Sequence, residues 1–444
     1  MGIPVHERRQ CAGIRLPGSE GEPGAATVPV DAWEEHGLRD AVKFAVVGLG
    51  GYGKSHLESA AEIQADGQGV LDAVVCIDPA NHTEKLAEYR GQGVRIFDTL
   101  EGLIAAGGVD VITLPIGIHD HVRLSARCMD AGYHVLVEKP LCGVVQDAEH
   151  LIDVRDRTGK TILIGYQHLY SQTIIELKKR VLDGRLGKVK MARLKASWPR
   201  GDHYYSRNPW AGTRQRDGIW TLDSPINNAL AHYLTNIFHL CSDTDGDPCG
   251  ITSVQAELYR AWEIENLDTA CLRVEMATGS TAVIAMSHVA SYAPDGSQFG
   301  PIMDMDCENG TVNWETGLAQ ISYTNGESET IDDGHSRMRT GPWRNMVSAL
   351  REGEPVLASL EMGRSQTIAI NGAHESCPRV HDFPAEEVET VMKGEHKFLE
   401  VKGLFDLLNR SADEGKLFSE LGVGWAKGSE PYSMEGYERF PAGG

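Results

Sequence analysis

A glycine-rich turn, Gly48-Leu49-Gly50-Gly51-Tyr52-Gly53, follows a short apolar run at residues 42–47 and precedes a helical pattern at about 53–65. The spacing of Gly48, Gly50 and Gly53 alone is weak evidence, because 49 of the 444 residues are glycine. The position of the turn between a strand and a helix makes it informative. Glycines there allow a tight turn and let the backbone approach a phosphate at the N-terminus of the helix. We therefore expect the fold to begin with the βαβ unit of a nucleotide-binding domain.

The alternation of strand and helix patterns continues after this turn. Strands are expected at residues 71–77, 109–115, 134–137 and 161–165, and helices at 83–92, 121–131 and 146–158. This order is typical of an α/β fold with a doubly wound parallel sheet. We predict a Rossmann domain over residues 41–168 that binds a dinucleotide.

The pattern changes from about residue 170 onward to longer strands of mixed polarity. These strands are expected at residues 189–197, 252–259, 269–276, 281–288 and 310–314, and helices at 225–240, 344–351 and 360–376. We predict a second α/β domain over 169–376, for substrate binding and oligomerisation, built on a large, mostly antiparallel, open-faced sheet. A leader arm over 1–40, rich in Gly, Pro and Glu, and a C-terminal extension over 377–444, with a helix near 402–415, complete the expected organisation.

Net charge and cysteine usage narrow the class of protein. The chain has 42 Lys and Arg against 63 Asp and Glu, a net charge of −21, without a basic block, so nucleic acids and anionic membranes are not expected partners. The nine cysteines are scattered and include no Cys-x-x-Cys pair, which favours reduced thiols in a cytoplasm over disulfides or a zinc site. No signal peptide and no membrane-spanning run is recognisable. We expect a cytoplasmic protein that needs no metal.

An acidic residue, Asp78, stands at the end of the second expected strand, 25 residues after Gly53. A carboxylate at this position accepts hydrogen bonds from the ribose hydroxyls of the adenosine half of a dinucleotide. It would repel a 2′-phosphate, and no arginine follows it directly. The sequence therefore favours NAD over NADP.

A lysine follows the strand at residues 134–137 in the segment Glu138-Lys139-Pro140. Ligands of doubly wound sheets bind at the carboxyl ends of the strands. A lysine there could hold a substrate hydroxyl and help its proton leave, and Lys139 is therefore a candidate catalytic residue. The competing interpretation, a surface lysine in a loop before a proline, is equally compatible with this segment alone.

The helix expected at 225–240 carries polar residues without a formal charge on one face. Ser224 is placed to cap this helix and Pro225 to begin it. At 100° per residue, one side is apolar and is formed by Ile226, Leu230, Tyr233, Ile237 and Leu240. The opposite side is formed by Asn228, His232, Asn236 and His239. Solvated faces usually carry Lys and Glu, so a face of amides and imidazoles is more typical of a cleft.

The segment between the second domain's first strand and this helix is rich in aromatic residues and arginine. Aromatic faces stack on sugar rings, and arginine or asparagine donors meet hydroxyls or a carboxylate, so the two arginines leave an anionic sugar open. The candidate substrate-binding residues in and near the segment are Gln167, His168, Trp198, Arg200, Tyr204, Arg207, Asn208, Trp210, Asn228 and His232. A loop with structural aromatics is the alternative interpretation.

These motifs resemble the glucose–fructose oxidoreductase, inositol dehydrogenase and rhizopine-catabolism (Gfo/Idh/MocA) family over about residues 42–376. The resemblance rests on the glycine-rich turn, on Thr113-Leu114-Pro115 with His119, on Glu138-Lys139-Pro140 and on the helix that carries His232. It implies NAD(P)-dependent redox chemistry on the hydroxyl groups of sugars and cyclitols, and a homodimer or homotetramer formed through the second domain's sheet. The implied cofactor-binding residues are Gly48, Gly50, Gly51, Tyr52, Gly53, Asp78, Thr113, Leu114, Pro115, His119, Glu138 and Lys139.

The resemblance implies that Lys139 and His232 are the catalytic residues, with His232 as the general base. The family often has an aspartate four residues before this histidine, where this chain has Asn228. An amide cannot share charge with an imidazolium, so His232 should be less basic here unless another acid, such as Asp223, approaches.

Three functions remain compatible with the sequence. The first is an NAD-dependent sugar or cyclitol dehydrogenase. The second is a redox-neutral glycosidase or lyase that oxidises a sugar carbon transiently and returns the hydride. The third is a non-enzymatic sensor of a sugar or cofactor, which would not need to keep both Lys139 and His232.

Overall fold

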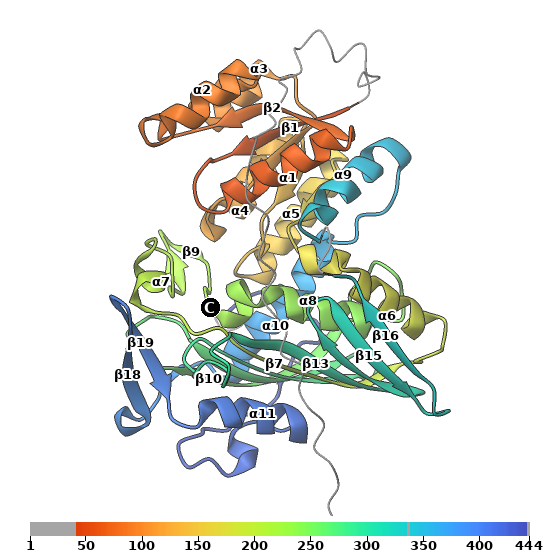
Figure 1. Cartoon of the computed structure of the whole chain (residues 1–444), viewed down its shortest axis with the longest axis vertical. Helices are drawn as coiled ribbons and strands as arrows, with labels where there is room; N and C mark the ends of the chain where they lie inside the picture. Colours follow the sequence, from red (N-terminus) through yellow and green to blue (C-terminus); the bar gives the residue numbers. More distant parts are fainter. Residues whose placement is uncertain (1–40, 335–337, 442–444) are drawn as a thin grey trace, which may run out of the picture.

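The N-terminal part of the chain forms a parallel sheet of six strands. The computed structural model describes residues 41–334 and 338–441, so the expected leader arm lies outside the described residues. The strands are β1 (Val42–Val47), β2 (Gly69–Val75), β3 (Arg95–Phe97), β4 (Val111–Leu114), β5 (His134–Val137) and β6 (Ile162–Ile164). Their spatial order is β3-β2-β1-β4-β5-β6, so the doubly wound Rossmann topology predicted from the sequence is confirmed. Figure 1 shows this part of the chain at one end of the molecule, with the second sheet at the other.

Helices cover both faces of this first sheet, which explains why its strands are apolar almost throughout. They are α1 (Gly53–Ala65), α2 (Thr83–Gly91), α3 (Leu100–Ala106), α4 (Ile118–Asp130) and α5 (Val145–Thr158). A distant helix, α9 (Gly341–Glu352), joins this layer, because Trp343 packs on Phe44 of β1 with ring centroids 4.7 Å apart. Residues far apart in sequence therefore share the core of the nucleotide-binding part.

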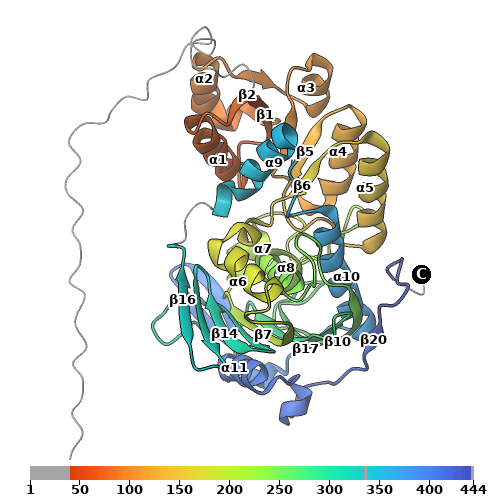
Figure 2. The ribbon, with the colours of Figure 1, turned by 90° about the vertical axis from the view of Figure 1, so that its right-hand side faces the viewer.

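The second sheet has ten strands and is mostly antiparallel, as predicted (Figure 2). Along the sheet the order is β16-β15-β14-β13-β7-β12-β11-β10-β17, with β20 also paired to β10. The central strands are β7 (Val189–Ser197), β10 (Ile251–Arg260), β11 (Thr269–Met276), β12 (Thr281–Ser287) and β13 (Phe299–Cys307). The outer ones are β14 (Gly310–Glu315), β15 (Leu318–Tyr323), β16 (Ser328–Asp332), β17 (His381–Asp382) and β20 (Tyr432–Ser433). Only β7 with β12 and β10 with β17 pair in parallel.

Three helices lie between the two sheets and bury the inner face of the second one. They are α6 (Gln172–Leu182), α8 (Ala231–Leu240) and α10 (Leu360–Ser376). The apolar side predicted for the helix at 225–240 is confirmed as part of this core. The helix is not continuous, however, because residues Pro225–Ala229 form a π-helical turn that ends at Leu230 with φ −113° and ψ 11°. Ser224 caps the turn by accepting a hydrogen bond from the Asn227 amide, as expected.

The C-terminal extension packs on the second sheet and beside the loop that follows β7. Helix α11 (Leu404–Glu414) lies on the outer face of β7 and β12, and the hairpin β18 (Val388–Lys393) and β19 (His396–Val401) reaches α7 (Asp202–Ser206) (Figure 1). The extension thus covers part of a sheet face that would otherwise be open. None of the helices in the described ranges is long and apolar enough to cross a membrane.

Candidate functional site

The glycine-rich turn joins β1 to α1 at the point where the strand order of the first sheet reverses. Gly48 and Gly51 adopt φ values of +101° and +52°, which L-residues with a side chain rarely adopt. A Cβ atom on Gly53 would lie closer than 3.0 Å to the Gly48 carbonyl oxygen. The close packing of turn and helix therefore requires glycine at this position, and the arrangement fits a pyrophosphate at the N-terminus of α1.

The expected ribose ligand, Asp78, lies at the start of a 3₁₀ turn after β2, and its side chain is half-exposed. Its carboxylate is 3.6 Å from His82 Nε2 and accepts a long hydrogen bond, 3.4 Å, from Asn81 Nδ2. The neighbouring Ile77 is 82% exposed, which suits an apolar face such as an adenine ring. His82 also approaches Gly50. Ile77 and His82 are not among the residues predicted from the sequence to bind the cofactor, and only their proximity to Asp78 in the chain indicates them.

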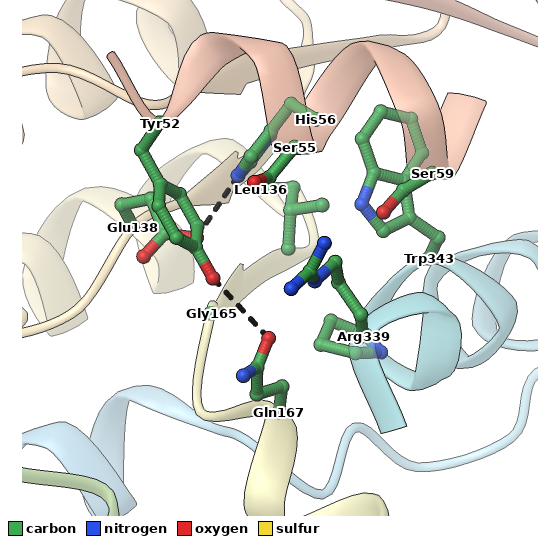
Figure 3. A pocket seen from close by; sticks show the side chains of 11 residues that line it. Tyr52, Ser55, His56, Ser59, Leu136, Glu138, Gly165, Gln167, Arg339 and Trp343 are labelled. Atoms are coloured by element: carbon green, nitrogen blue, oxygen red, sulfur yellow. Dashed lines mark hydrogen bonds and ion pairs between the residues drawn. The ribbon is translucent and has the colours of Figure 1, made fainter. Parts of the chain in front are cut away.

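Tyr52, at the start of α1, contacts the residue expected to bind substrate after β6. Tyr52 Oη donates a hydrogen bond of 3.3 Å to Gln167 Oε1. Both side chains line a small cavity of about 10 Å³, together with Glu138, Arg339 and Trp343 (Figure 3). This volume is enough for about one water molecule. The cavity therefore lies between residues expected to bind the cofactor (Tyr52 and Glu138) and a residue expected to bind the substrate (Gln167), but it is too small to hold a substrate.

Glu138 forms a buried contact with His56 of α1. His56 Nε2 lies 2.9 Å from Glu138 Oε1, while Glu138 Oε2 accepts a hydrogen bond from the backbone amide of Lys139 at 3.1 Å. Glu138 thus fixes the backbone that carries the lysine. His121 does the same from α4, because its neutral ring donates to either Pro140 O, 2.7 Å from Nδ1, or Ile116 O, 3.1 Å from Nε2. His56 lies 82 residues from Glu138 and His121 lies 19 residues from Pro140, so no local pattern in the sequence predicts either contact.

Lys139 bridges the carboxyl end of β5 to the π-helical turn of the second domain. Its Nζ donates to the backbone oxygen of Asn228 at 2.9 Å and to Asn228 Oδ1 at 3.0 Å. Asn228 Nδ2 in turn donates to Asp223 Oδ1 at 2.7 Å, and Asp223 Oδ2 accepts from the Gly212 amide at 2.7 Å. Asp223, the acid that the sequence analysis names as one that could approach, therefore contacts Asn228. The side-chain amide of Asn228 connects the Lys139 ammonium to the Asp223 carboxylate.

Burial shifts the pKa values of both ends of this relay toward the neutral forms. Burial lowers the pKa of Lys139 below its usual 10.5, with Glu138 and Asp223 opposing the shift. Burial also raises the pKa of Asp223 above 3.8, against its hydrogen bonds and the nearby arginine and lysine charges. Buried charges are costly. This network can hold them because each charged group is hydrogen-bonded.

His232 lies in the first turn of α8 and is 5% exposed. Its ring centroid is 4.8 Å from that of His168 and 6.2 Å from that of Tyr166. Burial, followed by the charges of His168 and Lys139, holds the pKa of His232 well below 6.5. Within the described residues, His232 Nδ1 has no hydrogen-bond partner. The ring is therefore a neutral imidazole at pH 7.

Asn236 and His239 also lie inside the protein, because every residue of α8 is buried. The expectation that the whole polar face lines a cleft is therefore wrong beyond His232. The packing of α6 and α10 against α8 covers this part of the helix.

The aromatic and arginine residues predicted to bind substrate gather around α7. The guanidinium carbons of Arg200 and Arg207 lie 4.9 Å and 3.5 Å from the ring centroid of Tyr204. They also lie 5.6 Å from Trp198 and 5.2 Å from Trp210, respectively. Asn208 instead shapes the loop, since its Oδ1 accepts a hydrogen bond of 3.1 Å from the Trp210 amide.

The segment at residues 113–119, expected at the cofactor, divides into buried and surface parts. Thr113 and Leu114 are fully buried in β4, and Pro115 and His119 are partly exposed. A Cβ atom on Gly117 would lie 3.1 Å from Trp210 Nε1, so the turn after β4 touches the loop after α7. The side chains of Thr113 and Leu114 pack inside the sheet, while those of Pro115 and His119 reach its edge, where cofactor binding stays a prediction.

The hairpin β18–β19 supports α7 from the other side. Asp202 Oδ1 lies 3.2 Å from His396 Nδ1, and Asp202 Oδ2 accepts from the Lys397 amide at 3.3 Å. Gly201 and Phe398 form an isolated β-bridge. The C-terminal extension therefore positions the segment that carries Tyr204 and Arg207.

Comparison with protein families finds two adjoining matches. Residues 42–166 match the family described as "Oxidoreductase family, NAD-binding Rossmann fold", and residues 174–313 match the "GFO/IDH/MocA C-terminal domain". Together the matches cover more than half of the chain.

Individual relatives are distant. An inositol 2-dehydrogenase from Rhizobium meliloti is 24% identical over 257 residues, 57% of this chain and 71% of that protein. A myo-inositol 2-dehydrogenase from Thermotoga maritima is 24% identical over 360 residues, 78% of this chain and 99% of that protein. The crystal structure of the WlbA dehydrogenase from Bordetella pertussis, in complex with NADH and UDP-GlcNAcA, superposes with a TM-score of 0.62 at 20% identity. That match covers 76% of this chain and 97% of the other, and it shows a shared fold.

Substitution of Gly53 tests the cofactor turn. We expect Gly53→Ala to weaken NADH binding at least about tenfold, because the added Cβ would displace the Gly48 carbonyl from the phosphate-binding turn. Gly91→Ala is the matched control, since nothing lies within 4 Å of a Cβ added there. Fluorescence titration with NADH measures the affinities. Unchanged affinity in a folded Gly53→Ala protein would place the cofactor elsewhere.

Proposed function

Because the chain belongs to the Gfo/Idh/MocA family of NAD-binding oxidoreductases, we propose that it is a dehydrogenase that oxidises a hydroxyl-bearing carbon of a sugar, a sugar derivative or a cyclitol. Relatives named inositol 2-dehydrogenases suggest this substrate class. The observation that carries the proposal is the contact between Lys139 Nζ and Asn228. It brings the lysine at the end of β5 to the helical segment that carries His232.

The residues around the glycine-rich turn fit NAD. The turn from Gly48 to Gly53 would hold the pyrophosphate, and Asp78 would accept hydrogen bonds from the ribose hydroxyls, which favours NAD over NADP. When bound, NAD supplies a nicotinamide ring that accepts a hydride. The carboxyl ends of β4, β5 and β6 carry the other candidate residues toward the same edge of the sheet.

His232 is the proposed general base. Its depressed pKa keeps the imidazole neutral at pH 7, and its Nδ1 has no partner in the described part of the chain. A neutral imidazole can take the proton of a substrate hydroxyl as the carbon-bound hydrogen leaves. Burial excludes the water that would otherwise compete for the ring.

Lys139 is proposed to stabilise the alkoxide that develops on the substrate oxygen. Its ammonium already donates to two oxygens of Asn228, which hold it in place and leave it a further donor. Asp223 balances its charge through Asn228, so the relay replaces the direct carboxylate that the family often has beside its histidine.

We also propose a homodimer or homotetramer that forms through the second sheet. Only part of the outer face of that sheet is open for this contact. Helix α11 covers the outer face near β7 and β12, so association would use the outer face of β13 to β16. That face exposes polar side chains such as Asp304, Asn313 and Gln320.

We also propose a cytoplasmic location, because the eight described cysteines are buried thiols without disulfide partners.

Turnover by variants of the two proposed catalytic residues tests the function. Pure protein is mixed with NAD and a panel of sugars, sugar acids and cyclitols, while NADH absorbance and product mass are followed together. We expect His232→Gln and Lys139→Met each to lower kcat at least about 100-fold, with NAD affinity retained, because the first removes the proposed base and the second removes the charge that stabilises the alkoxide. The exposed substitutions His150→Gln and Lys190→Met are the controls.

Two outcomes would contradict this assignment. Full turnover in both variants would exclude the proposed roles of His232 and Lys139. Product that forms without NADH would exclude net oxidation and support the redox-neutral glycosidase or lyase.

The pH dependence of turnover follows from the two shifted pKa values. The base is competent above the pKa of His232, which lies well below 6.5, so activity should persist at pH 6 and fall only at lower pH. The ammonium of Lys139 is lost as pH rises through its pKa, which lies below 10.5, so an alkaline decline should appear below that value. Profiles of kcat against pH check both limbs. An acid limb at or above pH 6.5 would exclude His232 as the buried base.

A further inference from the structure

We propose that the substrate carries an anionic group, a carboxylate or a phosphate, which Arg200 and Arg207 bind beside Tyr204. The proposal rests on the proposed function and specifies the substrate class of the same site. It starts from the position of two guanidinium groups on one aromatic ring, at 4.9 Å and 3.5 Å from its centroid.

Neither arginine forms an ion pair within the described residues, although the charge of Arg207 also acts on Asp223. No carboxylate oxygen there lies within 4.0 Å of Arg200 or Arg207, although the chain has a net charge of −21. Other arginines of the same part of the fold do have such partners, for example Arg216 with Asp217 and Arg260 with Asp382. The two guanidiniums share one aromatic ring and carry the same charge, so an anionic group bound between them would relieve their repulsion.

The hydrogen bonds of the two arginines leave most of their donors available. Arg207 Nη1 donates to the Tyr204 backbone oxygen at 2.5 Å. The Nε of Arg200 is buried and has no hydrogen-bond partner in the described ranges. A guanidinium has five N–H donors in a planar fork that matches carboxylate and phosphate oxygens. The oxygens of an anionic group would accept hydrogen bonds from the free donors of both arginines.

The surrounding charges favour an anion at this place. Lys139 adds a third cation, and the charges of Arg207 and Arg200 contribute to the lowering of its pKa. Of the two acids that influence Lys139, Glu138 is engaged by His56, and Asp223 accepts from Asn228 and Gly212. Three cations therefore lie near two carboxylates, and both carboxylates already accept hydrogen bonds within the protein.

Aromatic and imidazole groups give the site a place for the rest of the ligand. Trp198 and Trp210 flank the arginines, and an apolar sugar face stacks on such rings. His288 is buried beside Tyr205, whose Oη lies 3.3 Å from His288 Nδ1, and His288 Nε2 has no partner among the residues described. These groups suit a ring with hydroxyls next to the charged substituent.

Matched pairs of ligands test the proposal. Binding to the protein saturated with NAD is measured by calorimetry at constant ionic strength, with D-glucuronate and D-glucose 6-phosphate each compared with D-glucose, and D-galacturonate with D-galactose. We expect at least one acid to bind about tenfold or more tightly than its neutral partner, since a charge-assisted pair to arginine is about twice as strong as a neutral hydrogen bond. A uronate advantage identifies a carboxylate, and a 6-phosphate advantage identifies a phosphate.

Arginine variants show whether that preference depends on this site. Arg200→Gln and Arg207→Gln should each reduce the acid's advantage at least about fivefold while leaving NADH binding unchanged. Arg216→Gln, which removes an arginine already paired with Asp217, should preserve the advantage. The proposal is wrong if no acid binds better than its neutral partner, or if the preference survives in both variants.

The same experiment separates this inference from the proposed function. Turnover of neutral sugars with no preference for acids would overturn the anionic substrate and leave the dehydrogenase in place. Tight binding of an acid with no NADH formed from it would support the arginine site and count against the dehydrogenase.

Discussion

The hydrogen bonds from Lys139 Nζ to Asn228 are the contact on which the site depends. They join the carboxyl end of a Rossmann strand to the π-helical turn that precedes α8, so they set the position of His232 relative to the cofactor-binding edge. Glu138 and His121 fix the lysine's backbone from the first domain, and Asp223 orients Asn228 from the second. π-Helical turns are rare, but those that occur are frequently at functional sites, and here the turn brings the Asn228 amide to the Lys139 ammonium.

Burial determines the protonation states in this arrangement. It keeps His232 neutral and lowers the pKa of Lys139, while Asp223 is held by two hydrogen bonds despite its raised pKa. The segment with Arg200 and Arg207 lies outside this buried network and is supported by the C-terminal hairpin through Asp202 and His396. The proposed base, His232, is thus buried, whereas the arginines of the proposed anion site are more exposed.

The sequence predicts the parts of the fold that local patterns determine. The run at residues 42–65 predicts β1, the turn and α1, because apolar periodicity and glycine spacing act over short distances. It does not reveal β3, which has three residues and begins with Arg95, or β13, in which Asp304 and Asp306 alternate with buried methionines. The contacts of His56 and His121 depend on tertiary packing, so no local signal could indicate them. Asp223 approaches Asn228 at the π-helical turn, where the sequence pattern predicts a regular helix.

A double-mutant cycle on the relay tests the central claim most directly. Hydride transfer in a single turnover is compared among the parent protein, Asp223→Asn, Asn228→Ala and the double variant, with NADH affinity as the control for folding. If Asp223 acts on Lys139 through Asn228, the loss caused by Asp223→Asn should shrink at least about tenfold in the Asn228→Ala background. Equal losses in both backgrounds would show that the two residues act independently and would contradict the account.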